Sequence, residues 1–129
     1  MSLNRRQILT YAAAACSLPA MASAASDNKP MQFIVPFGPG GSGDISARML
    51  AEWITKKTGR SVVVENKPGA NGIIGVEAAR KAPADGSVLL LATTSTHLAN
   101  PYLFKKLPYD PGKDFRLVGT FGTGSFYIL

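Results

Sequence analysis

Cysteine and histidine are nearly absent from this chain of 129 residues, which has one of each, Cys16 and His97. Cys16 lies in an N-terminal segment that has the pattern of a removable export signal, so we expect no disulfide bond and no thiol chemistry in the mature chain. A single histidine without a cysteine supplies none of the spacings that hold a metal ion. The sequence therefore predicts no metal site and no cofactor.

Long blocks of like charge are also missing, although the formal net charge is +6. Without Arg5 and Arg6 of the N-terminal segment, 12 basic and 8 acidic residues remain, spread along the chain. No basic cluster is interleaved with aromatic residues, as would be typical of a nucleic-acid-binding surface. The diffuse positive excess fits an ordinary basic surface or the attraction of small anions, and it argues against nucleic acid as a partner.

Residues 1–25 have the three parts of an export signal. Arg5 and Arg6 precede an apolar run from Ile8 to Leu18, which is too short to cross a bilayer core of about 30 Å. Residues 22–24 (ASA) then provide a small-x-small cleavage pattern. The arginine pair permits the twin-arginine route as well as the Sec route. A lipoprotein site at Cys16 is disfavoured because the usual leucine three residues earlier is missing, and we therefore predict a periplasmic protein.

From Met31 onward, short apolar runs alternate with helical patterns. The runs have no polar alternation, which is typical of parallel strands buried on both faces; they lie at residues 33–35, 62–64 and 88–92. Helices are predicted over 44–58 and about 72–82, and apolar residues four apart place Trp53 on the packing face of the first. Because parallel strands need right-handed crossovers, residues 26–129 are predicted to form an α/β fold with an open parallel sheet and flanking helices.

Three loops follow the predicted strands, at residues 38–43, 67–71 and 93–100. In such a sheet these loops open at the same edge, where ligands of open α/β folds bind. The loops are rich in Gly, Ser, Thr and Asn, which offer backbone N–H groups and small polar side chains. Helix N-termini behind them favour negative charge, so the sequence predicts a binding edge for an anion.

The first loop also matches a dinucleotide-binding pattern. Gly38, Gly40 and Gly43 fit G-x-G-x-x-G, and Glu65 follows at a suitable distance, so a Rossmann-type oxidoreductase domain is the alternative function. Against it, Pro39 stiffens the loop and Asp44 would place a carboxylate beside the pyrophosphate. No Gly-Lys-Ser/Thr follows, which excludes a nucleoside triphosphate P-loop.

Catalytic residue sets are scarce in this sequence. Ser95 is two residues from His97 but lies in no G-x-S-x-G elbow, and the acidic residues form no close pair. His97 is expected to be a loop or half-buried residue held by a hydrogen bond. The sequence therefore indicates a binding protein and not an enzyme.

Four blocks cover nearly all of the chain that follows the N-terminal segment. They are residues 34–45 (IVPFGPGGSGDI), 63–72 (VVENKPGANG), 84–86 (ADG) and 100–115, which contain NPYLFKKLPYDP and end in DF. Together and in this order, they resemble the tripartite tricarboxylate transporter receptors, also called Bug-type extracytoplasmic solute receptors. The resemblance implies a two-domain periplasmic binding protein of the type II-like fold, which closes over its ligand.

The resemblance also implies a ligand, partners and a site. The ligand would be a small carboxylate (a di- or tricarboxylate, an amino acid or an aromatic acid), and the membrane components of a tripartite carrier would be partners. The implied ligand-binding residues are Phe37, Gly38, Pro39, Gly40, Gly41, Ser42, Asp44, Thr94, Ser95 and Asn100. Asp44 has two open roles, as a contact to an amino or hydroxyl group of the ligand or as a cap of its helix.

Receptors of this family are much longer than this chain, which ends within a predicted strand at residues 125–129. We therefore expect residues 26–129 to be an incomplete first lobe, with the second lobe absent. A truncated remnant without function is a further alternative, since a receptor of this kind gains affinity by closing over its ligand.

Overall fold

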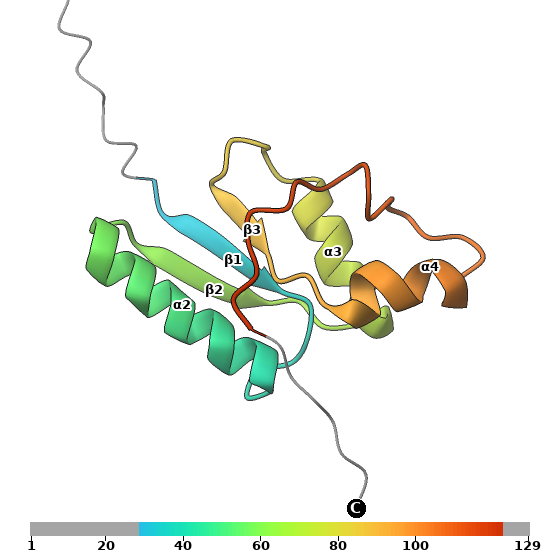
Figure 1. The fold of residues 1–129 in the computed structure, drawn as a ribbon, viewed down its shortest axis with the longest axis horizontal. Helices are drawn as coiled ribbons and strands as arrows, with labels where there is room; N and C mark the ends of the chain where they lie inside the picture. The colour runs from blue at the N-terminus through green and yellow to red at the C-terminus, as the bar shows by residue number, and fades with distance from the viewer. Residues whose placement is uncertain (1–28, 123–129) are drawn as a thin grey trace, which may run out of the picture.

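The computed structural model describes residues 29–122, so the predicted export signal and the predicted strand at residues 125–129 lie outside the described part (Figure 1). The elements, in chain order, are β1 (Met31–Val35), α2 (Ser42–Thr58), β2 (Val62–Asn66), the 3₁₀ turn η2 (Ala70–Gly72), α3 (Ile73–Arg80), β3 (Val88–Leu90), the π-helical turn η3 (Ser95–Ala99) and α4 (Asn100–Leu103).

The three strands form one parallel sheet in the order β2-β1-β3. Phe33 at the centre of β1 is opposite Val64 of β2 and Leu89 of β3. The continuous apolar runs thus became parallel strands, and the predicted open parallel sheet with flanking helices is confirmed. No helix in the described residues is both long and apolar enough to span a membrane.

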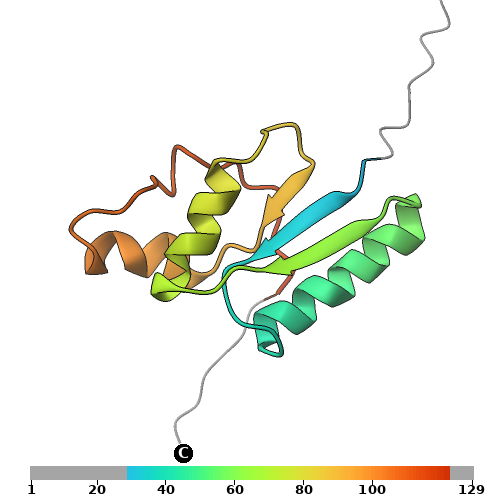
Figure 2. The same cartoon turned by 180° about the vertical axis from the view of Figure 1, so that it is seen from behind.

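Alternate residues of β1 face two different helices. Phe33 and Val35 form a buried cluster with Ala47 of α2 and with Leu91, whereas Ile34 points to the opposite face and is 2% exposed. Helices α2 and α3 lie on opposite sides of the sheet, as Figures 1 and 2 show from the front and the back. This arrangement follows from two right-handed crossovers that run in opposite directions, from β1 to β2 through α2 and from β2 to β3 through α3.

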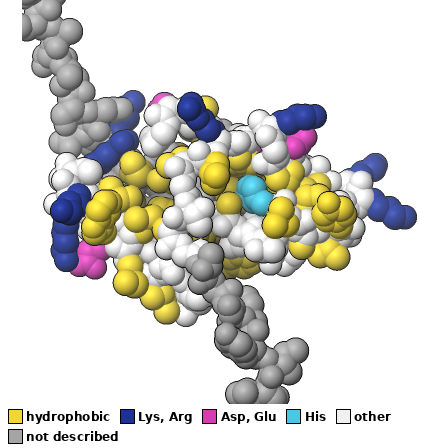
Figure 3. Space-filling view, in the orientation of Figure 1, with side chains coloured by type: hydrophobic (Ala, Val, Ile, Leu, Met, Phe, Trp, Pro, Cys, Tyr) yellow, Lys and Arg dark blue, Asp and Glu magenta, His cyan; other side chains and the backbone are white. Residues whose placement is uncertain are grey.

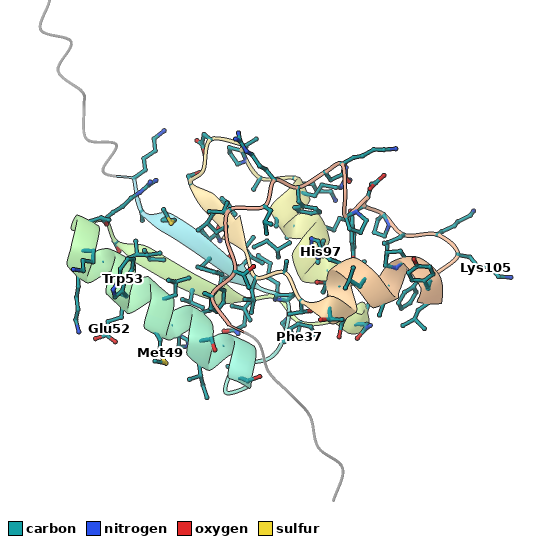
Figure 4. The ribbon with its side chains drawn as sticks, in the orientation of Figure 1. Phe37, Met49, Glu52, Trp53, His97 and Lys105 are labelled. Carbon is teal, nitrogen blue, oxygen red and sulfur yellow. The ribbon has the colours of Figure 1, made fainter. Side chains whose placement is uncertain are left out.

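Helix α2 ends at Thr58 as the sequence predicts, but it begins two residues earlier than predicted and has a different packing face. Its C-cap is Gly59, whose φ of 71° is left-handed and whose N–H donates to the Thr55 carbonyl at 2.9 Å. The buried residues beyond the first turn are Ala47 and Ala51, whose small side chains let the helix approach the sheet closely. Trp53 is 58% exposed, so the expectation that it lies in the core was wrong (Figure 4).

The segment after β3 also differs from the expected loop. Residues 95–103 are helical, as η3 followed directly by α4. Apolar side chains are exposed along this segment, with Tyr102 91% exposed, and others are exposed over α2 (Figure 3). Ser, Thr and Asn are typical of loops in a sequence, but here their side chains are used to hold a turn together.

Candidate functional site

The carboxyl ends of the three strands lie at one edge of the sheet. The chain leaves β1 toward β2 on one side and later returns to β3 on the other, so the connections diverge between β1 and β3. In open α/β sheets, this divergence point is where ligands bind. The segments that border it are residues 36–41 after β1 and residues 91–96 after β3.

The glycine loop, defined as residues 37–43, leads from β1 into α2. Residues 38–42 are exposed, and Phe37 is half-buried. Gly41 is the N-cap of α2 and makes no side-chain capping bond. The first N–H groups of any helix lack partners within the helix, and the aligned peptide dipoles of this 17-residue helix place partial positive charge there. The loop therefore offers a small anion backbone donors at an exposed edge.

Asp44, in the first turn of α2, holds this loop from behind. Its Oδ2 accepts hydrogen bonds from the Gly40 N–H at 2.9 Å and from Arg48 Nε at 3.0 Å. Its Oδ1 lies 3.0 Å from Arg48 Nη2 and accepts a 3.0 Å bond from Asn66 Nδ2. The residue is only 4% exposed. These bonds are those of a carboxylate that shapes the loop.

The same bonds make the ionised form of Asp44 favourable. Donation by Arg48, then by the Gly40 N–H and Asn66, lowers the pKa of Asp44 from its ordinary value of 3.8 to about 2. Because the folded pKa is lower than that of the unfolded chain, ionised Asp44 stabilises the fold. This contribution is complete well above pH 3.8 and is lost as the pH falls toward 2.

We expect the stability difference between the wild type and Asp44→Asn to shrink as the pH falls from 5 toward 2 (the range that the lowered pKa sets). Urea unfolding at several pH values would measure it. The other acidic residues titrate in both proteins and cancel in the difference. A difference that is the same at pH 5 and near pH 2 would contradict a native-state role for the ionised carboxylate.

On the other side of the divergence point, a threonine pair closes the turn after β3. Thr96 is fully buried, and its Oγ1 accepts a bond from the Thr93 N–H at 3.0 Å and donates to the Thr93 carbonyl at 3.1 Å. It also lies 3.0 Å from Nδ1 of His97. The predicted ligand residues Thr94 and Ser95 lie between these two threonines, Thr94 exposed and Ser95 half-buried.

Asn100 lies deeper, in a buried network that joins α4 to η2. Its Nδ2 donates to the Asn71 carbonyl at 3.2 Å and to the Tyr109 hydroxyl at 3.1 Å, and its Oδ1 accepts a bond from Asn71 Nδ2 at 2.6 Å. Tyr109 in turn donates to the Thr96 carbonyl at 2.6 Å. Asn100 is fully buried, so its bonds support the turn after β3 from below.

The structure thus divides the predicted site residues into two groups. Residues 37–42, Thr94 and Ser95 lie on the surface or half-buried at the sheet edge, whereas Asp44 and Asn100 are buried in supporting networks. No hydrogen bond within residues 29–122 joins the glycine loop to Thr94 or Ser95. Sequence reasoning missed the supporting residues, which are Arg48, Asn66, Asn71, Thr96 and Tyr109. The only indication in the sequence was the position of Arg48 one helical turn after Asp44, a spacing that allows an ion pair.

His97 is half-buried and held by a hydrogen bond, as predicted, and it also lies against aromatic rings. Its ring centroid lies 5.3 Å from that of Phe115 and 6.3 Å from that of Tyr109, and burial lowers its pKa (Figure 4). The residues described contain no group of three or more His, Cys, Asp or Glu side chains placed to hold a metal ion. The hydrogen bond to Thr96 and the ring contacts account for the position of His97.

Comparison with known proteins agrees with this geometry. Protein BugT of Bordetella pertussis is 44% identical over 95 residues, a match that covers 73% of this chain and 29% of BugT. MatC from Rhodopseudomonas palustris with bound malate is similar in structure, with a TM-score of 0.64 and 36% identity over 67% of this chain and 29% of MatC. The chain spans about a third of the length of the curated relatives that it matches.

Two further solved structures have the same fold. The periplasmic binding protein BugD has a TM-score of 0.63 and 41% identity over 67% of this chain and 28% of its own. A Rhodopseudomonas palustris protein with adipate has a TM-score of 0.62 and 32% identity over 64% and 28%. Residues 46–129 match the model of the tripartite tricarboxylate transporter family receptor. The chain therefore belongs to this receptor family.

Proposed function

We propose that this chain forms the first lobe of a periplasmic receptor that binds a small carboxylate for a tripartite tricarboxylate-type carrier. The observation that carries the proposal is the glycine loop, which presents exposed backbone N–H groups at the N-terminus of α2. A carboxylate is the guest that such donors and such a dipole favour. The chain acts by binding and has no catalytic role.

The comparisons support the ligand class. MatC carries malate and its Rhodopseudomonas palustris relative carries adipate, two dicarboxylates of different length. BugD is a periplasmic binding protein, which supports export and a cleaved N-terminal segment for this chain. The family is described as receptors of the tripartite tricarboxylate transporter, which supports a role in delivering the ligand to a carrier.

The geometry does not favour the dinucleotide alternative. In a dinucleotide-binding loop, the backbone approaches a pyrophosphate through the glycines. Here the Gly40 N–H donates to Asp44 instead, at 2.9 Å. The carboxylate of Asp44 thus occupies a backbone donor that a pyrophosphate would need.

Ser42→Pro tests whether the backbone at the helix N-terminus binds the ligand. Ser42 is the first residue of α2, where proline fits the helix and removes the backbone N–H together with the hydroxyl. Gly41, with φ of −76° and ψ of 165°, already has the extended conformation that precedes proline. We expect the affinity for malate or adipate to fall about 10- to 100-fold, the worth of one hydrogen bond to a charged group. Isothermal titration calorimetry would measure it.

Ser42→Ala is the matched control because it removes the hydroxyl and keeps the N–H. The protein itself should be titrated with malate, adipate and NAD, together with a hybrid in which residues 30–122 replace the matching segment of MatC. Loss of affinity in both variants would assign the contact to the hydroxyl. If neither the chain nor the hybrid binds malate or adipate, or if NAD alone binds, the proposed function is wrong.

A further inference from the structure

Asn66 connects two strands at the edge where the ligand is proposed to bind. It is the last residue of β2 and lies opposite Val35, the last residue of β1. Its side chain extends past β1 to the glycine loop, where Nδ2 donates to the Phe37 carbonyl at 3.1 Å and to Asp44 Oδ1 at 3.0 Å. One amide group therefore fixes both the start of the loop and the carboxylate behind it.

Arg48 completes this arrangement from the next turn of α2. Its Nε and Nη2 each lie 3.0 Å from one oxygen of Asp44, a two-point contact that a planar guanidinium makes and a lysine does not. Its Nη2 also donates to Asn66 Oδ1 at 3.1 Å. The three side chains form a closed triangle of hydrogen bonds, which we call the loop-holding cluster.

The bonds of the cluster leave Asp44 no free acceptor. Four donors converge on its two oxygens, which is about the number that a carboxylate can accept. The charge of Arg48 offsets that of Asp44, so the buried carboxylate does not repel an anion at the helix N-terminus. Asp44 is thus equipped to organise the donors of the glycine loop and not to contact a ligand.

We propose that Asn66, through Asp44 and Arg48, is a positioning residue that sets the conformation of the glycine loop for carboxylate binding without touching the ligand. The proposal rests on the proposed function for its ligand, but the loop geometry can be tested without one. An amide is needed at this position because it donates to Phe37 and Asp44 and accepts from Arg48 at the same time. An ionised carboxylate accepts hydrogen bonds but cannot donate one, so it could not replace the amide.

Asn66→Asp is the most informative variant because it nearly preserves the shape of the side chain and replaces the donating amide nitrogen with an accepting oxygen. At neutral pH it would place a second carboxylate against Asp44 Oδ1 and the Phe37 carbonyl, and one of the two carboxyl groups should then titrate at a raised pH. The other charged groups nearby are Arg48 of α2 and the two chain neighbours Glu65 and Lys67, which pair with each other at 2.6 Å. The loop should be displaced at pH 8 and restored as a shared proton returns toward pH 5.

The experiment measures malate affinity from pH 5 to 8 in the wild type, Asn66→Asp and Asn66→Ala, always as a ratio to the wild type at the same pH. The ratio removes the ionisation of malate itself. We expect Asn66→Ala to bind about 10-fold more weakly at every pH, as for the loss of hydrogen bonds to a charged group. Asn66→Asp should bind about 100-fold more weakly at pH 8 and recover at least about tenfold by pH 5. A residue with a merely structural role would show no such pH dependence.

Glu52→Gln is the control, since it breaks a 2.7 Å ion pair with Lys56 on the exposed side of the same helix (Figure 4). It should leave both affinity and its pH dependence unchanged. Malate affinity in Asn66→Ala equal to that of the wild type, or an Asn66→Asp ratio that does not vary with pH, would overturn the inference.

The amide proton of Gly40 gives a second readout, without ligand. In the wild type its NMR resonance should move only at low pH, as Asp44 protonates, and in Asn66→Asp it should move between pH 5 and 8. If the wild type does not bind malate, the proposed function is wrong. The Gly40 resonance would still show whether Asn66 holds the loop. A Gly40 resonance that is unaffected by either Asn66 substitution would overturn the positioning role.

Discussion

Gly75→Ala is expected to lower the free energy of unfolding by about 1–3 kcal/mol, although glycine-to-alanine changes within helices usually raise it. The reason is the close approach of α3 to the strand ends. A Cβ at Gly75 would lie 2.8 Å from the Lys67 carbonyl oxygen and from Cα and Cβ of Pro36. Two of these three atoms belong to the backbone and cannot move without shifting the loops after β1 and β2. The helical gain of about 1 kcal/mol is therefore outweighed.

Gly119→Ala is the matched control for this prediction. A Cβ there meets nothing within 4 Å, and the position has no positive φ, so its effect should stay within about 0.5 kcal/mol. Urea unfolding of both variants gives the comparison. An increase in stability for Gly75→Ala would show that α3 does not pack as closely against Pro36 as described.

Phe33→Ala should have a larger effect, about 3–5 kcal/mol, because it empties the centre of the sheet. Phe33 is 3% exposed, lies among Val35, Ala47 and Leu91, and contacts the ring of Phe121 edge to face with centroids 6.4 Å apart. A loss of this size is comparable to the whole stability of a small domain, so chemical unfolding should show a largely unfolded chain.

Val63→Ala provides the comparison on the neighbouring strand. Val63 is 54% exposed on β2, so the same truncation to alanine should cost less than about 1 kcal/mol. The measurement is again the unfolding free energy. Equal losses for the two variants would contradict the assignment of the core to the face that α2 covers.

The strands could be predicted from their local composition, although only the central strand β1 is deeply buried. Val62–Val64 and Val88–Leu90 are continuous apolar runs, and such runs have few alternatives to a parallel sheet. The C-terminal end of α2 could be predicted for a similarly local reason. Gly59 adopts the left-handed conformation that ends a helix, and Lys56 and Lys57 lie in its last turn.

The packing face of α2 could not be predicted from apolar spacing alone. Ile45, Met49 and Trp53 are four residues apart, yet each is more than half exposed. The face against the sheet is instead formed by Ala47 and Ala51, with Leu50 packed beside them against the core, because a close helix-to-sheet approach needs small side chains. A spacing rule that counts only large apolar residues misses these two alanines.

The supporting residues of the site were beyond sequence reasoning for a different reason. Asn66 is 22 residues from Asp44, and Asn100 is 29 residues from Asn71, and each pair meets only once the sheet has formed. Composition identified the glycine loop because its exposed backbone is a local property. It could not show which polar side chains turn inward to hold that loop.

Asn71 and Gly72 have a consequence for the chemical ageing of the protein. An Asn-Gly pair deamidates when the glycine nitrogen attacks the asparagine side chain and forms a cyclic imide. In the folded chain, the Gly72 N–H is engaged by the Gly69 carbonyl at 2.9 Å, and Asn71 Nδ2 by Asn100. Asn71 itself has a φ of 53°, and Gly72 has a φ of 86°. Both partners of the reaction are thus restrained by the turn, and the pair is protected for as long as the sheet edge remains folded.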